Sequence, residues 1–495
     1  MTALAFAVAA AVALVSLPGL DDEGYLTFIG AKTLDVAPLA TLFFQKFHPL
    51  LSVVYAPVAL LGWWPFLVAH AAVAACGVYF VGAAVQNLGG RGWLASALVA
   101  TSPIFLMAAV SGQSDTDGVV ALALVLYLHA RGGRAASAAA VVAGACLWTR
   151  YEFSIPLAFI VLDGAIHGGR WVGVRRAALA LVFPVLYGLA GAVYHHDVWW
   201  LLQYPPNLTR PVVESAAYHF LSFNWRTVAE WWLGLTLAVP CWPGVMAVRY
   251  RRLPQTGRML GISAAVLVVP LVVLPLFHMV FEGLGPRYML VFLPIVAACI
   301  SLDPGVRIRR TGSVVAVTGA VAWITLPALP RRVRALLGAA AAPSLYATVD
   351  HLERESHHGV VYTNDRQLAV LLRWSHPEIR GVLLPQHDVL IEVYLLANHS
   401  NGQYSSLIKA LGSTLYGGAM WPCAMGVVGD NDRFVLDRDV RLHVLYPETY
   451  WDAYTQLELR VGDFSIRRPR ANVTRMPPPP RPSGVPVAPL VAPCR

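Results

Sequence analysis

The stretch MTALAFAVAAAVALVSLPGLDDEGYLTFIG (residues 1–30) runs an apolar segment directly into three consecutive acids, Asp21, Asp22 and Glu23. An apolar run of about 20 residues matches the thickness of the hydrocarbon core of a bilayer. The run has no basic start and no clear small-residue cleavage site before Asp21. We therefore expect an uncleaved first transmembrane helix rather than a signal peptide, with a dense acidic cluster at its mouth.

The composition of the whole chain agrees with a membrane protein. Its 495 residues are 57% hydrophobic and 13% charged, with a mean hydropathy of +0.57, whereas about 25% of residues are charged in an average soluble protein. The net charge of +9 can indicate nucleic-acid binding. However, the arginines cluster in short loops between apolar runs, where membrane topology explains them, so we expect no nucleic-acid partner. Six scattered cysteines show no metal-binding spacing.

Apolar runs of membrane type recur through the first 330 residues. They lie at 3–20, 48–62, 63–86, 92–112, 117–131, 135–149, 153–166, 176–195, 229–248, 259–280, 287–303 and 312–329. The short basic loops at 89–92, 130–134, 167–176, 249–258 and 304–310 all belong in the cytoplasm by the positive-inside rule. This holds if 48–62, which contains two prolines, is a re-entrant or interfacial segment. The sequence thus predicts an α-helical polytopic protein with about 11 transmembrane helices and its N-terminus inside.

The same topology gathers the acidic and polar loops on the outer face. These loops are 21–28, 111–118, 149–153, 195–220 and 281–288, and the region after the last span joins them. Ionisable groups at a membrane boundary usually serve binding or chemistry. The outer face is therefore where we expect a functional site.

Beyond the predicted membrane module, 1–330, the composition becomes that of a soluble domain. Strand-like segments lie at 359–364, 381–385, 440–447 and 457–468, and a helix at 365–376 is expected to be capped by Asn364 or Asp365. A small extracytoplasmic α/β domain is predicted over 344–470. The tail 471–495 is rich in proline and is predicted to be disordered.

The three acids of the first loop have a structural and a functional explanation. Asp21 or Asp22 can cap a helix, and Glu23 is favourable in its first turn. An apolar stripe at helical spacing follows, made of Tyr25, Leu26, Phe28 and Ile29. Such a stripe is typical of a helix lying on the membrane surface. Capping needs one acid rather than three, so we expect a functional acid here as well.

Three further outer loops carry charged residues that can either stabilise the structure or bind a substrate. Asp115 and Asp117 can cap the run at 117–131, or they can flank a substrate together with the first-loop acids. Arg287 can extend toward lipid headgroups or grip a phosphate with its bidentate fork. Arg150 is a weaker candidate of the same kind.

The order of these motifs resembles the GT-C glycosyltransferases, and within them the protein mannosyltransferase and lipid A aminoarabinose transferase group. The residues that carry the resemblance are Asp22-Glu23 with Tyr25, His48-Pro49-Leu50 with Gly62-Trp63, Asp117, and Arg287-Tyr288. The resemblance covers about 1–330. It implies a polyprenyl-phosphate-linked sugar donor and an acceptor that is a protein, a lipid or a glycan.

The resemblance also implies roles for individual residues. Asp22 or Asp21 would take the proton of the acceptor hydroxyl, and Asp117 or Asp115 would orient the acceptor, bind a cation or stabilise charge on the sugar. Arg287 would hold the phosphate. Further substrate-binding candidates are Glu23, Tyr25, His48, Arg150 and Tyr288. A divalent cation, Mg²⁺ or Mn²⁺, is left open, because some relatives need one and others do not.

The expected location is the cytoplasmic (inner) membrane of a bacterium, with the site and the C-terminal domain in the periplasm. The competing interpretation is a transporter or flippase of a lipid-linked or small polar substrate. It predicts ionisable residues near the middle of the spans and inverted repeats. The spans show no evident repeat and few such residues. One of them is Asp163, late in its run.

Overall fold

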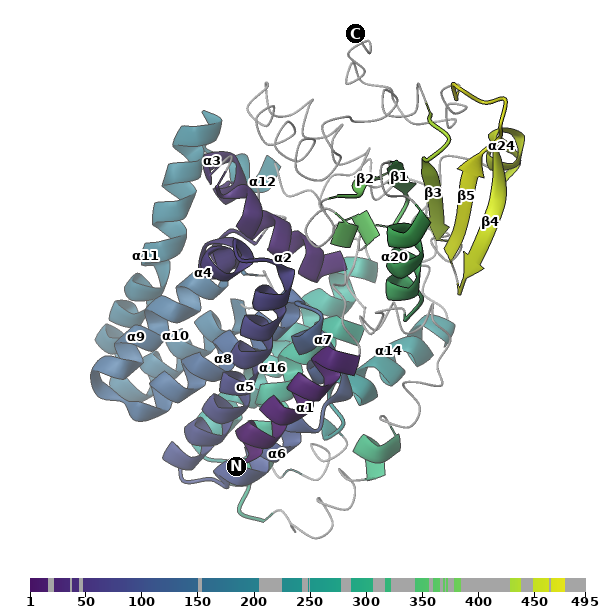
Figure 1. The fold of residues 1–495 in the computed structure, drawn as a ribbon. Coiled ribbons are helices and arrows are strands. Elements are labelled where there is room, and N and C mark those ends of the chain that lie inside the picture. Colours follow the sequence, from purple (N-terminus) through teal and green to yellow (C-terminus); the bar gives the residue numbers. More distant parts are fainter. Residues whose placement is uncertain are drawn as a thin grey trace.

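The computed structural model of the chain is mostly helical, with one small sheet (Figure 1). It describes residues 1–16, 22–35, 38–43, 48–149, 154–203, 225–242, 248, 250–276, 286–305, 317–321, 343–355, 359–365, 368–369, 371–372, 378–383, 428–437, 448–462 and 464–476.

The helical elements that precede residue 305 form one bundle. In chain order they are α1 (Thr2–Ser16), α2 (Asp22–Thr33), α3 (Pro38–Leu42), α4 (Pro49–Ala59), α5 (Trp63–Asn87), α6 (Gly92–Ala100), α7 (Pro103–Val110), α8 (Ser114–Arg131), α9 (Gly133–Cys146), α10 (Ser154–Gly168), α11 (Arg170–His195), α12 (Trp200–Gln203), α14 (Trp225–Ala238), η4 (Tyr250–Arg252), α16 (Gln255–Leu276), η5 (Pro286–Val291) and α17 (Phe292–Leu302). Figure 1 shows α2, α3 and α4 gathered toward one end of the bundle, with the N-terminus of α1 at the other. The long helix α5 packs against α1, α4, α6, α7 and α8.

Among the described residues, two helices are long and apolar enough to cross a membrane. They are α5 and α11, and the bent pair α6 and α7 is a third candidate span. Shorter apolar helices include α4, which has 11 residues. At a rise of about 1.5 Å per residue, α4 cannot cross a bilayer of about 30 Å, in keeping with the expected re-entrant or interfacial segment at 48–62. The total of eleven spans stays a prediction.

The run 92–112, expected to be one straight span, is broken into two helices. The axes of α6 and α7 differ by 68° at the break. Pro103 lies at the start of α7, where its missing N–H removes a helical hydrogen bond, and Ser102 caps the new helix by accepting from the N–H of Phe105 at 3.2 Å. The hydroxyl of Ser102 also donates to the carbonyl oxygen of Ala238 at 2.6 Å, which ties the break to α14.

The apolar stripe of α2 packs against protein, so the expectation of a helix lying on the membrane surface through this stripe is wrong. Leu26, Phe28 and Ile29 are all buried. The ring of Phe28 lies 5.5 Å from the ring of Phe66 in α5, measured between centroids. Because α2 packs against α4 as well, the apolar side chains are covered by the helices that follow them in the chain.

Asp163 of α10 is buried at the opposite end of α8 from the acidic loop 111–118. The Nε2 of His129, in the last turn of α8, lies 2.6 Å from its carboxylate, and the Nδ1 of His167 lies 2.8 Å from the other oxygen. The guanidinium of Arg176 in α11 approaches to 4.0 Å. Asp163 therefore joins three helices through one buried carboxylate.

Replacing Asp163 with asparagine is expected to lower the thermal stability of the protein. A hydrogen bond to a charged group contributes about 1.5–3 kcal/mol, and the amide keeps the shape but not the charge. His167→Gln is the matched control with a smaller expected loss, because that side chain is 41% exposed. A thermal melt of purified protein measures both. An unchanged melting temperature for Asp163→Asn would contradict a structural role for the cluster.

The C-terminal domain is built on a five-stranded sheet with the order β2-β1-β3-β5-β4. The strands are β1 (Val360–Thr363), β2 (Arg380–Leu383), β3 (Arg433–Asp437), β4 (Thr455–Val461) and β5 (Phe464–Pro469). The helix α20 (Pro343–Glu355) precedes β1, and α24 (Glu448–Tyr454) lies between β3 and β4 in the chain. β1 pairs in parallel with β2 and β3, and β5 pairs antiparallel with β3 and β4. Alternate residues face opposite sides: Val361 and Val435 join the core shared with the helical bundle, whereas Tyr362 and Phe434 form a second core.

The described residues of this region contain both helices and strands, and several lie where the sequence predicts them. The strands expected at 359–364 and 381–385 are present, and 457–468 forms the hairpin of β4 and β5. The carboxylate of Asp365 accepts from the N–H of Leu368 at 2.7 Å, as a helix cap does. The strand expected at 440–447 and the tail after 476 lie outside the described residues. The central strand β3 was not predicted.

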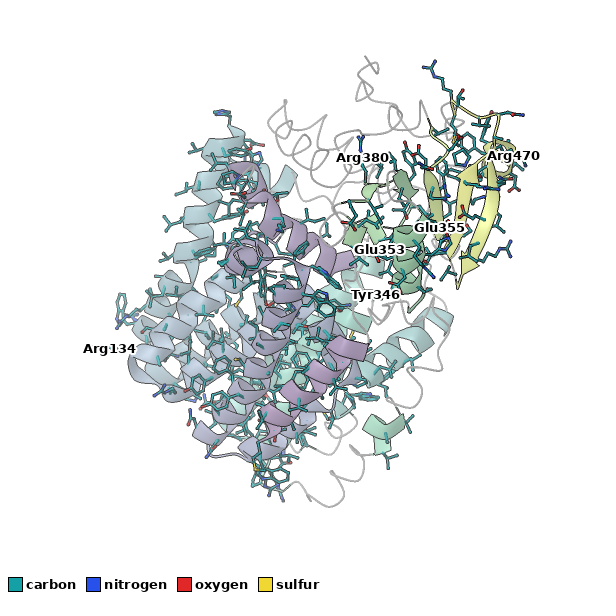
Figure 2. All side chains as sticks on the ribbon, viewed as in Figure 1. Arg134, Tyr346, Glu353, Glu355, Arg380 and Arg470 are labelled. Atoms are coloured by element: carbon teal, nitrogen blue, oxygen red, sulfur yellow. The ribbon has the colours of Figure 1, made fainter. Side chains whose placement is uncertain are left out.

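The junction between the two parts of the molecule is aromatic. Tyr346 of α20 stacks on Trp63, the first residue of α5, with ring centroids 6.5 Å apart and planes inclined by 24°. Figure 2 shows Tyr346 at the end of α20 that faces the helical bundle. Since one hydrophobic cluster runs from the helices into α20 and β1, the C-terminal domain is packed on the bundle rather than merely linked to it.

Candidate functional site

The site begins at the N-terminus of α8, where two carboxylates are buried together. Asp115 and Asp117 lie in the first turn of the helix, and Ser114 and Thr116 beside them are buried too. The N-cap position is taken by Gln113, so neither aspartate is the capping residue. A helix N-terminus carries a partial positive charge, which favours carboxylates in this first turn.

Asp117 is held by two side chains from other helices. The hydroxyl of Tyr55 in α4 donates to its Oδ1 at 2.5 Å. The Nε2 of His70 in α5 lies 3.1 Å from its Oδ2. Both carboxylate oxygens are therefore engaged, and α4, α5 and α8 meet at this one group.

His70 is in turn fixed by the turn between α7 and α8. Its Nδ1 lies 2.8 Å from the carbonyl oxygen of Ala109, and its Nε2 lies 3.1 Å from the carbonyl oxygen of Gln113. The aromatic rings of Tyr55 and Phe66 also lie near the imidazole of His70, with ring centroids 5.6 and 6.1 Å away. The imidazole thus bridges the last turn of α7 and the first turn of α8.

The first-loop acids meet this turn through a close backbone contact. α2 begins at Asp22, and Gly24 lies directly against the loop after α7. A Cβ built on Gly24 would overlap the carbonyl oxygen of Ser111 and lie 3.1 Å from the carbonyl carbon of Gly112. The tertiary structure therefore brings the N-terminus of α2 to the loop that directly precedes the helix turn with Asp115 and Asp117.

The other predicted residues are placed at the level of the backbone. Glu23 and Tyr25 lie in the first turn of α2 beside Asp22, while Asp21 and Arg150 fall outside the described residues. Arg287 and Tyr288 lie in η5, which packs against α7 and α8. The arginine segment and both acidic segments thus border α7 and α8.

His48 has a local structural role. It is the N-cap of α4 with φ 49°, in the left-handed region, and Pro49 follows it as the first helical residue. That conformation is uncommon for a residue with a side chain. It starts the short helix that delivers Tyr55 to Asp117.

Tyr55 and His70 were not predicted as site residues. Tyr55 is hidden in an apolar run, and a tyrosine there is an ordinary core residue. His70 did give a signal, because an ionisable residue inside a candidate span usually has a partner and a role. Asp163 was named above among the ionisable residues of the predicted spans, but His70 was not.

The described residues contain no group of three or more histidine, cysteine, aspartate or glutamate side chains arranged to hold a metal ion. Tyr55 and His70 each contact one of the two carboxylate oxygens of Asp117. The side chains of the first-loop acids are not among those described.

Comparison with solved structures identifies a shared fold. The crystal structure of ArnT from Cupriavidus metallidurans bound to undecaprenyl phosphate aligns with a TM-score of 0.57 and 14% identity, over 95% of this chain and 98% of that chain. The same protein in the apo state aligns with a TM-score of 0.54 and 15% identity, over 94% and 97%. No family model and no curated protein sequence matches the chain. The chain therefore has a fold similar to that of ArnT along nearly its whole length, whereas the resemblance in motif order covers about 1–330.

Proposed function

We propose that this chain is an integral membrane glycosyltransferase. It moves a sugar from a polyprenyl-phosphate donor to a hydroxyl group of an acceptor at the extracytoplasmic face of the membrane. The observation that carries the proposal is the contact of Gly24 with Ser111, because it brings two acidic segments from separate loops to one place. The alignment with ArnT, whose structure holds undecaprenyl phosphate, supports a polyprenyl lipid as the donor's carrier.

The chemistry follows from the leaving group. The acceptor oxygen attacks the anomeric carbon, the bond from that carbon to the phosphate oxygen breaks, and the phosphate leaves with the electron pair. Phosphate needs no strong general acid, so the protein has to supply a base for the acceptor proton and positive charge for the phosphate. Asp22, or Asp21 beside it, takes the proton. A single displacement of this kind inverts the configuration of the anomeric carbon.

The test is transfer by purified protein in lipid nanodiscs. A polyprenyl-phosphate sugar pool with radiolabel in the sugar is incubated with membrane extract as the source of acceptors. The expected result is label in a new covalent product, whose linkage has the opposite anomeric configuration to the donor by NMR. The class of that product identifies the acceptor as protein, lipid or glycan. A parallel assay uses the protein in proteoliposomes, which enclose a compartment. Label that crosses their bilayer without forming a new bond would favour the transporter instead.

Replacing Arg287 with glutamine is expected to raise the KM for the donor by about ten- to a hundredfold. A charge-assisted hydrogen bond contributes about 1.5–3 kcal/mol, and about 1.4 kcal/mol corresponds to a factor of ten. Arg287→Lys keeps the charge but loses the bidentate fork, so its KM for the donor should lie between those of the wild type and Arg287→Gln. Arg251→Gln, at an exposed arginine of η4, is the control. An unchanged KM in Arg287→Gln would contradict phosphate binding by this residue.

A further inference from the structure

The surroundings of His70 consist of hydrogen-bond acceptors. Its side chain is 0% exposed. One ring nitrogen faces the carbonyl oxygen of Ala109, and the other faces the carbonyl oxygen of Gln113 and the carboxylate of Asp117. Among the side chains that the structure describes, the titratable groups that face it from the packed helices are Asp117 of α8 and Tyr55 of α4, whose hydroxyl is directed to Asp117.

A neutral imidazole does not fit these partners. It has one N–H and one lone pair, so either tautomer directs a lone pair at a carbonyl or carboxylate oxygen. A buried polar group without its hydrogen bond costs about 1–3 kcal/mol, and no solvent reaches this side chain to compensate. The imidazolium donates from both nitrogens and satisfies all three acceptors. An opposite charge within about 4 Å favours that charged form.

We infer that His70 is a permanently protonated imidazolium paired with the carboxylate of Asp117. The proton of Tyr55 then lies on its own hydroxyl, donated to the ionised carboxylate. The pair is neutral as a whole, which is the form in which charges are tolerated in the interior of a helical bundle. The charge of Asp117 is thereby matched and its oxygens are occupied.

The pair gives Asp117 a positioning role. His70 joins α5 to both sides of the turn between α7 and α8, and this turn carries the Ser111 carbonyl against which Gly24 packs. The imidazolium and Asp117 therefore fix the position of that turn relative to the N-terminus of α2. This step rests on the proposed function, since it makes His70 a positioning residue for the first-loop base. The charge state itself does not depend on the function.

The charge state is measured directly by NMR of protein labelled with ¹⁵N in its 15 histidines. An ordinary exposed histidine, with a pKa of about 6.5, is neutral at pH 8.5. The expected result is one imidazole that keeps both nitrogens protonated at pH 8.5 and is missing from the spectrum of His70→Gln. If His70→Gln fails to fold, the double variant His70→Gln/Asp117→Asn serves as the subtraction reference. A neutral tautomer for His70 at that pH would overturn the inference.

A double-mutant cycle on thermal stability is the second measurement. His70→Gln leaves an unpaired buried carboxylate and Asp117→Asn leaves an unpaired buried cation, so each alone should lower the melting temperature. The double variant removes both charges and should be more stable than the sum of the single losses predicts. Additive losses would overturn the ion pair. Sugar transfer by the same samples is scored separately: a wild type without transfer refutes the proposed function while leaving the NMR result standing.

Discussion

Replacing Asp22 with asparagine is expected to lower kcat for sugar transfer by about 10²–10⁴-fold, the usual contribution of a general base, with little change in the KM for the donor. The amide keeps the size and hydrogen-bonding reach of the side chain but cannot take a proton. Asp22 is the first residue of α2, and the contact two residues later holds this helix end against the α7–α8 turn. The assay is the initial rate of labelled-sugar transfer over a range of donor concentrations, which gives both kcat and the KM for the donor.

The controls for this prediction lie in the same segment. Asp35→Asn changes an exposed acid just after α2 and should leave kcat unchanged. Asp21→Asn decides between the two neighbouring carboxylates, because only the base should show the full loss. Full activity in both Asp21→Asn and Asp22→Asn would mean that these acids are helix caps, and the base would have to be sought elsewhere.

The variant Gly24→Ala should lose both stability and transfer activity. Its methyl group would overlap the carbonyl oxygen of Ser111, which is backbone and cannot rotate away. Overpacking of this kind costs about 1–3 kcal/mol. If the chain relieves the clash by moving α2 from the turn by about 1 Å, the rate can fall by a further 10²-fold, because the base is then out of reach. Thermal melts and initial rates of transfer measure the two effects.

The control is a helical glycine with room for a methyl group. At Gly188 in α11, the nearest atom to a built Cβ is the Cδ1 of Leu201 at 3.6 Å, an ordinary contact. Alanine is favoured over glycine inside a helix by about 1 kcal/mol, so Gly188→Ala should be neutral or stabilising. Both substitutions replace glycine with alanine. Gly24→Ala should lower the stability of the protein, whereas Gly188→Ala should leave it unchanged or raise it. A Gly24→Ala variant as stable and active as wild type would remove the main support for a shared site.

The fold class and the two-part organisation follow from the sequence because they depend on patterns that are local in the chain. Apolar runs between basic loops predict membrane helices, and alternating segments after 344 predict strands. The described residues have helical elements in the apolar runs up to 303, and strands in three of the four predicted strand segments. The prediction from the sequence was wrong where tertiary packing decided which surface an apolar stripe contacts. The stripe of α2 fits a membrane surface as well as a protein core, and nothing within residues 22–33 distinguishes the two.

The sequence by itself also determined which segments are acidic, and it ordered them as the GT-C glycosyltransferases do. Only the tertiary structure decided that the N-terminus of α2 lies on Ser111, and that Asp117 is tied to Tyr55 and His70. These contacts join residues 47 to 87 positions apart in the chain (70 to 117 and 24 to 111). No periodicity encodes such distances, because they arise from how α2, α4, α5 and α8 pack, and that packing depends on side chains from all of them at once.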